Sequence, residues 1–409
     1  MPNRLFTPAG TATSFGGMLL IGGLEALYGP SLIRLIERFD VSPSAVGVIV
    51  SAHFVGGFLG VLASQRIHAR IGNRILLIAG YLLLISGSIG FAWAPTLTLA
   101  IAASAFAGLG FGALDYAFSH LFAVAFGSGS PAMLNLLHGF FGAGAILAPL
   151  VVALFGPDHY PEYFTGFAVL VLITALGVHG VRSFPTQGSS TPETEGASTV
   201  RGLRVAGKPV FFIGAFVAMV CVFILHVAVG SGIGSWEAAY LILTGLSVEQ
   251  AAAATSLFWL CMTASRFVLA AVIKRLSPAT VVTLSCSLMM FGSAIALVPG
   301  LAVAGLAMVG FAIGPVFPTA LAWAAHLFGG QSRVSGSLIA ISMTGGIAFP
   351  PILGATVSVR SDLSHFPLAL AGLSSLCLLA CLAISGLRHI QHQFDPQAKE
   401  DTPLPLQGN

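Results

Sequence analysis

Apolar residues fall in runs of about 20 that end at glycines, prolines or charged side chains, and each run is long enough to cross a bilayer as one α-helix. We count about twelve such runs, which predicts an all-α membrane protein. In the first half of the chain the predicted helices cover residues 11–36, 43–64, 75–94, 97–126, 132–155 and 163–181. In the second half they cover residues from 209 onward, 248–273, 278–297, 301–328, 334–357 and 366–387.

A polar stretch separates the two halves. Residues 183–208 are rich in Ser, Thr, Pro and Gly and carry too little apolar surface to pack. The sequence therefore predicts a six-helix bundle over 1–182, a cytoplasmic linker over 183–208, a second six-helix bundle over 209–387 and a disordered cytoplasmic tail over 388–409. Gly230, Gly232 and Gly234 are expected to break the first helix of the second bundle.

Basic residues set the predicted orientation. If both termini are cytoplasmic, Arg34, Arg38 and Arg360 are the only ones of the 17 Lys and Arg residues that lie outside. Positively charged loops stay in the cytoplasm. We therefore expect an integral protein of the cell (inner) membrane with both termini inside.

The composition agrees with a membrane protein and argues against other classes of protein. The chain has 409 residues, of which 56% are hydrophobic and 8% charged, against about 25% charged in soluble domains. It has no phosphate-binding G-x-x-x-x-G-K-[ST] motif, no basic face for nucleic acid and no sizeable soluble domain. The five cysteines lie in apolar segments without metal-type spacing. We expect no enzyme, no cofactor and no metal site.

Two carboxylates lie inside predicted spans. Asp115 stands in the middle of the run 97–126, and Glu25 lies in a glycine-rich segment of the first helix. An acid at the bilayer centre costs about 2.5–3.5 kcal/mol, so it marks a solute or proton path by default. We expect both to face one central cavity and to bind solute and protons, because proton uptake relieves their mutual repulsion. The alternative is a structural hydrogen bond between helices.

Other polar and aromatic residues are candidates for solute binding. Tyr28 shares the face of Glu25, and Asn135 and His138 lie one turn apart. These two side chains could bind hydroxyl groups or relay a proton to Asp115. An indole ring could stack on the apolar face of a sugar, and the candidates are Trp323, Trp236 and Trp259. Packing between helices is the alternative for each, and we expect it for His53, His120 and His226.

The two halves repeat a pattern. Gly110-Phe111 has a counterpart 200 positions later in Gly310-Phe311. Gly144 precedes Pro149 by five residues, as Gly345 precedes Pro350. Two parallel repeats with a solute site between them are typical of alternating-access transporters.

The loop after the second helix carries a family resemblance. It reads Q-R-I-H-A-R-I-G-N-R from Gln65, against G-x-x-x-D-R-x-G-R-R in the major facilitator superfamily. Arg70, Gly72 and Arg74 match, while Ala69 replaces the acid. The chain thus resembles a major facilitator superfamily transporter over essentially its whole length. The resemblance implies a gating role for these three residues. Arg266 lies near the cytoplasmic end of the predicted helix 248–273, where we expect a gate or interface charge and not a ligand.

Within that superfamily the chain is most similar to the fucose-permease and glucose/galactose-permease type. The similarity lies in Glu25, Asp115, the I-G-x-W pattern over 233–236 and the G-P-x-x-P pattern over 314–318. It implies proton-coupled uptake of a small polar solute, with a sugar as the leading candidate and the two acids as coupling groups. The expected partners are solute, protons and the lipid bilayer, and the expected state is a monomer.

Three other functions stay open. A sugar uniporter would use the same carboxylates for binding alone. A proton-coupled exporter of hydrophobic or cationic compounds would also use them, but Ala148 before Pro149 departs from the antiporter pattern G-x-x-x-G-P-x-x-G-G. A transporter-like sensor would need a cytoplasmic partner domain, for which the linker and tail are short.

Overall fold

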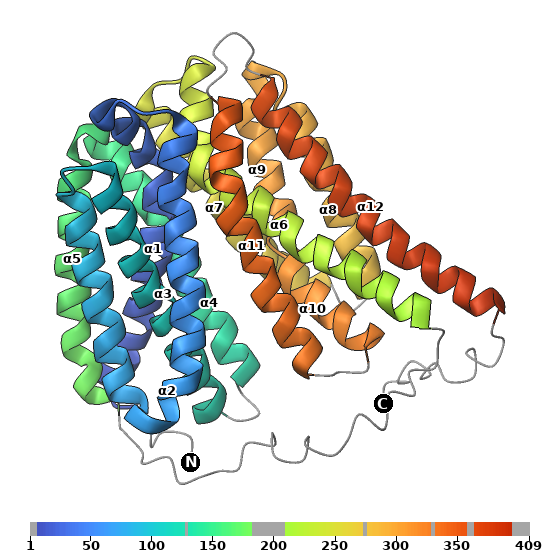
Figure 1. Cartoon of the computed structure of the whole chain (residues 1–409), viewed down its shortest axis with the longest axis horizontal. Helices are drawn as coiled ribbons and strands as arrows, with labels where there is room; N and C mark the ends of the chain where they lie inside the picture. Colours follow the sequence, from blue (N-terminus) through green and yellow to red (C-terminus); the bar gives the residue numbers. More distant parts are fainter. Residues whose placement is uncertain are drawn as a thin grey trace.

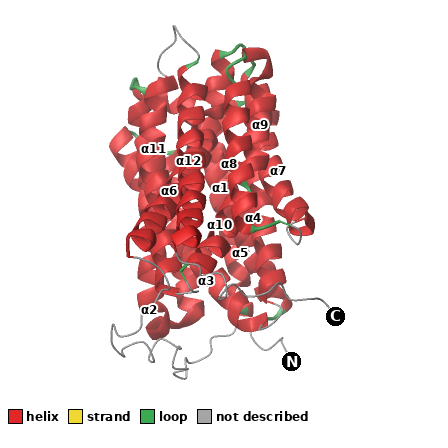
Figure 2. Cartoon of the chain, turned by 90° about the vertical axis from the view of Figure 1, so that its right-hand side faces the viewer, coloured by secondary structure: helices red, strands yellow, loops and turns green. Residues whose placement is uncertain are grey.

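The computed structural model describes residues 6–126, 130–181, 209–272, 276–328, 332–357 and 364–394. Within these ranges the chain is helical, as Figure 2 shows, and extended backbone pairs only at the bridge between Phe6 and Val181. Eleven helical segments in the described part are long and apolar enough to cross a membrane. The predicted all-α membrane architecture is confirmed.

The helices of the first half are α1 (Pro8–Phe39), α2 (Pro43–Ala92), α3 (Leu97–Phe126), α4 (Ser130–Phe155) and α5 (Tyr160–Ala175), with short 3-10 helices η2 (Pro157–His159) and η3 (Leu176–Gly180). Those of the second half are α6 (Pro209–Leu243), α7 (Val248–Val272), α8 (Pro278–Ile295), η6 (Pro299–Leu301), α9 (Ala302–Ile313), α10 (Val316–Leu327), α11 (Ser332–Val357) and α12 (His365–Phe394).

Helix α2 is long enough to cross the membrane twice. Its 50 residues would extend about 75 Å as a straight helix, more than twice the hydrocarbon thickness. The backbone leaves helical geometry at Gly72 (φ 76°, ψ 166°), and the chain turns back there (Figure 1). Since α9 and α10 together form the single span Pro299–Leu327, each half contributes six crossings.

The structure corrects two predicted boundaries. Helix α6 runs unbroken through Gly230, Gly232 and Gly234, which leave room for the side chains of neighbouring helices instead of ending the helix. Helix α12 continues to Phe394 and does not end at 387. The predicted linker 183–208 and the tail beyond 394 lie outside the described residues.

The repeated glycines make equivalent contacts in the two halves. A Cβ on Gly144 of α4 would overlap the carbonyl oxygen of Leu19 on α1, and one on Gly345 of α11 would overlap that of Ile224 on α6. In each half, glycine therefore lets the fifth crossing lie directly on the backbone of the first.

The two bundles meet mainly where α1 packs on α6, α2 on α11 and α4 on α7, and α1 makes a smaller contact with α7. We call the end where α1 leads into α2 the distal end, which is the extracellular side in the predicted orientation. There the Ser44 hydroxyl donates to the Pro351 carbonyl oxygen over 2.8 Å, and Gly47 packs on the backbone of Pro350 and Pro351. Figure 1 shows the bundles converging at this end and diverging at the other.

Candidate functional site

The centre of the molecule holds a small cavity between the bundles. Its side-chain walls are Glu25 and Tyr28 of α1, Val50 and Phe54 of α2, and Trp259 of α7. The wall from α6 consists of Gly230, Ser231, Gly234 and Ser235. The volume open to the centre of a water molecule is about 10 Å³, room for about one water.

Glu25 of this cavity belongs to a set of four charged or titratable side chains that interact electrostatically. Glu25 interacts electrostatically with Asp115 of α3 and with Arg266 of α7. His138 of α4 interacts with the same two partners. Glu25, Asp115 and His138 are half-buried and Arg266 is exposed, so these groups are accessible. The three groups of the first bundle thus share a site with one cation of the second.

The G-P-x-x-P pattern explains how Arg266 is held. In a continuous helix the Gly314 carbonyl would accept from the residue four positions on, but that residue is Pro318, which has no N–H. The helical hydrogen-bond pattern is interrupted here between α9 and α10, although Gly314 and Pro315 keep helical backbone angles. Arg266 Nε donates to the freed Gly314 oxygen over 3.2 Å. Pro318 in α10 therefore frees the carbonyl group that positions Arg266 of α7.

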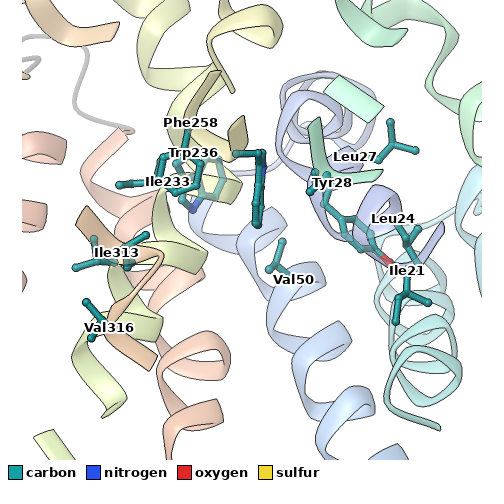
Figure 3. Close-up of a cluster of buried hydrophobic side chains, with 14 of the residues drawn as sticks. Ile21, Leu24, Leu27, Tyr28, Val50, Ile233, Trp236, Phe258, Ile313 and Val316 are labelled. Atoms are coloured by element: carbon teal, nitrogen blue, oxygen red, sulfur yellow. The ribbon is translucent and has the colours of Figure 1, made fainter. Parts of the chain in front are cut away.

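Tyr28 and Asn135 are the remaining polar candidates of the first bundle. Tyr28 is buried, and its hydroxyl lies 3.3 Å from Nδ1 of His53 within the first bundle. Figure 3 shows its ring pointing away from Trp236 of the opposite bundle. Asn135 is exposed, one turn from His138. Their predicted roles in solute binding stay predictions.

The tryptophans differ in what their indole nitrogens do. Trp236 is fully buried and donates to the Pro350 carbonyl oxygen over 2.7 Å, which ties α6 to α11. Trp323 is buried in α10, and its Nε1 has no hydrogen-bond partner. Trp259 also has an unpartnered Nε1, and it is the tryptophan that lines the cavity with Glu25. Of the three candidate indoles, Trp259 is thus the one that lines this cavity.

The three histidines for which packing is expected contact neighbours in their own bundle. His53 bonds to Tyr28, His226 to the Val222 carbonyl oxygen, and the ring of His120 packs against those of His68 and Tyr116. Among the described residues, no group of three His, Cys, Asp or Glu side chains has the arrangement of a metal site.

The predicted gating residues of the loop lie at the turn inside α2. Arg70 and Arg74 are exposed there, and Gly72 between them has the positive φ that favours glycine. Their gating role stays a prediction.

One buried acid is not among the residues of the predicted site. Glu237 lies in α6 and is 1% exposed. The rule that singled out Asp115, an acid within an apolar run, applies equally to Glu237. Glu237 directly follows Trp236 of the I-G-x-W pattern, so its place in an apolar run is the signal that identifies it.

Comparison with known proteins identifies the family. The sequence profile of the Major Facilitator Superfamily matches residues 14–350. The chain belongs to this superfamily. It is therefore a membrane transporter of the secondary type and not an enzyme. No protein in the comparison with curated sequences matches the chain.

Solved structures share the fold at low sequence identity. A crystal structure of a D-xylose–proton symporter matches with a TM-score of 0.76 and 14% identity, covering 91% of this chain and 96% of that one. The nucleoside transporter NupG matches with a TM-score of 0.74 and 14% identity, covering 92% and 99%. The peptide transporter POT, in complex with sulfate, matches with a TM-score of 0.72 and 15% identity, covering 93% and 94%. The predicted major facilitator fold is thereby confirmed.

Proposed function

We propose that the protein is a proton-coupled symporter that takes up a small, mostly neutral polar solute, with a sugar as the first candidate. The observation that carries this proposal is the position of Arg266. It lies in the second bundle and interacts electrostatically with Glu25 of the first. A charge interaction across the two moving halves can couple protonation to the motion between them.

Charge balance sets the proposed stoichiometry. Glu25 and Asp115 bring two negative charges to the site, and Arg266 brings one positive charge. With His138 neutral, the site carries a net negative charge of one, which is costly to enclose in a low-dielectric interior. One bound proton makes the site neutral. We therefore propose that one proton accompanies each neutral solute.

The chemistry of the lining favours a hydroxyl-bearing solute. Carboxylates and the His138 imidazole offer hydrogen-bond acceptors and donors, and Trp259 offers an aromatic face and an N–H without a partner. Sugars combine hydroxyl groups with an apolar ring face, which suits this combination. The D-xylose–proton symporter with a similar fold is in keeping with this class.

The energetics are sufficient for accumulation. A proton that moves with the membrane potential releases about 2.3 kcal/mol per 100 mV. This free energy supports a concentration ratio of tens-fold, since about 1.4 kcal/mol corresponds to a factor of ten.

The variant Asp115→Asn tests the coupling. It keeps the shape of the side chain but removes its charge and its proton. In proteoliposomes we expect Asp115→Asn to exchange labelled for unlabelled sugar near the wild-type rate while losing accumulation driven by an inward proton gradient.

The matched control is Glu249→Gln, which neutralises an exposed acid in the first turn of α7. We expect this variant to keep both activities. Unchanged uphill uptake by Asp115→Asn would refute the coupling role of Asp115.

A further inference from the structure

Helix α6 carries a carboxyl group that the proposed site does not use. Glu237 is 1% exposed, and neither of its carboxyl oxygens has a hydrogen-bond partner. A buried ionised carboxylate without a partner costs several kcal/mol, whereas the neutral acid costs far less. In the state described here, Glu237 is therefore expected to hold a proton.

The side chains around α6 supply no positive charge that would neutralise an ionised Glu237. Cys261 of α7 interacts electrostatically with Glu237, and a thiol supplies no positive charge. Arg266 of the same helix interacts with Glu25, His138 and His226. The described salt bridges do not include Glu237. The remaining titratable side chains on helices packed against α6 include the buried thiols Cys377 and Cys381 of α12.

Glu237 lies beside the contact between the bundles. Gly230 and Gly234, seven and three residues before it, share its side of α6 and line the cavity with Glu25. Gly234 contacts Gly29 of α1, where a Cβ on Gly29 would overlap the Gly234 carbonyl oxygen. Glu237 is about one turn nearer the distal end than this contact.

Two hydrogen bonds flank it. Trp236 donates to Pro350 of α11, and Tyr240 donates to the Ala296 carbonyl oxygen over 2.7 Å. The distal half of α6 is thus fixed to its own bundle on either side of Glu237. Opening the distal end would separate α6 from α1 and admit water along the face that carries Glu237.

We propose that Glu237 is a second proton-binding site, which takes up a proton from distal water as the distal contacts close and returns it to distal water when they open, so that it adds nothing to the one proton carried inward with each solute. Proton release favours the open state, and proton binding permits closure. The proposal rests on alternating access from the proposed function but not on Glu25 and Asp115 as its coupling groups.

Access to a distal cysteine tests this switch. Ser44 lies in the distal contact, and Ser44→Cys, in a chain whose five native cysteines are replaced, reports its opening to a membrane-impermeant maleimide. Cells or outward-oriented vesicles are labelled over a range of external pH. Rates are divided by those of the denatured protein at each pH, which removes the intrinsic reactivity of the thiol.

We expect normalised labelling to rise with pH when Glu237 is present, by up to about tenfold per pH unit, the ceiling for one titrating group. Glu237→Gln should label slowly at every pH, whereas Glu249→Gln should keep the pH dependence. The same pH dependence in Glu237→Gln would overturn the proposal.

A second measurement covers the case in which Glu237→Gln does not fold. A hydrophobic carbodiimide reacts with protonated buried carboxyl groups, and mass spectrometry locates the adduct in the wild-type protein. We expect modification of Glu237 at low pH that declines as pH rises, and its absence at every pH would overturn the proposal. If Asp115→Asn lost coupling while Glu237→Gln kept the wild-type pH dependence of labelling, the role of Glu237 would be refuted and the proposed function would stand.

Discussion

Arg266 is the residue on which the charge balance of the site depends. Replacing it by Gln leaves Glu25 and Asp115 without their cation, so enclosing the site would need a second proton. We expect Arg266→Gln to lose most uphill uptake at neutral pH and to recover part of it at lower pH. Sugar-driven proton entry, followed with a trapped pH-sensitive dye, measures this.

Arg66 supplies the control, since it is exposed and its guanidinium bonds to the Leu62 carbonyl oxygen of its own helix. Arg66→Gln should behave as wild type. Normal coupling at neutral pH in Arg266→Gln would contradict the charge-balance argument.

Gly72 is a second residue with a definite physical requirement. Its φ of 76° and ψ of 166° lie in a region that is nearly exclusive to glycine. We expect Gly72→Ala to destabilise the fold by about 1–3 kcal/mol, seen as a lower melting temperature in detergent. Gly166→Ala within α5 meets open space and should be neutral or slightly stabilising. Equal melting temperatures for the two variants would contradict this account of the turn.

The sequence alone could identify the acids of the site but not all of the residues that form it. Glu25 and Asp115 stand out because acids are rare in apolar runs, and Glu237 obeys the same rule. The positions of Arg266 and Trp259 depend on how α7 aligns with α1, which no local pattern contains. That Pro318 frees a carbonyl group for Arg266 becomes evident only when α7 and α9 are known to be neighbours.

At the scale of helices, glycines decide how closely two crossings approach. Gly144 and Gly345 place α4 on α1 and α11 on α6 with backbone against backbone. We expect Gly144→Val and Gly345→Val each to cost at least about 1–3 kcal/mol, because the carbonyl oxygen they meet belongs to rigid helix backbone. Thermal unfolding followed by size-exclusion chromatography measures the loss.

Gly372 of α12 provides the comparison, because a Cβ there meets nothing within 4 Å. Gly372→Val should unfold near the wild-type temperature. If all three variants unfolded alike, the close helix contacts would not be the reason for these glycines.

Helix boundaries show where apolar patterning fails. The prediction for 97–126 coincides with α3. In the sequence, Pro95 and Thr96 precede this apolar run, and Gly127 follows it. Helix α6 continues through three glycines because neighbouring side chains fill the space beside them, among them Leu353 at Gly232 and Trp259 at Gly234. Packing that compensates for glycine is a tertiary effect, and the local sequence gives no sign of it.

For the whole molecule, the described state is closed at the distal end. Oxidation of the pair Ser44→Cys and Pro351→Cys, in the chain without native cysteines, should covalently join α2 to α11 there. We expect the cross-link to stop transport and a reductant to restore it, with each single variant insensitive to oxidant. Full transport by the cross-linked protein would show that the distal contacts need not separate.

The most direct test of the account is uptake of a panel of radiolabelled sugars into proteoliposomes, with an inward proton gradient and with the gradient collapsed. The account predicts that at least one sugar accumulates only with the gradient, and that Asp115→Asn abolishes this accumulation. Equilibration of a sugar independent of the gradient would contradict proton coupling and indicate a uniporter. No flux of any sugar would contradict the substrate class and direct the search to cations and amphiphiles.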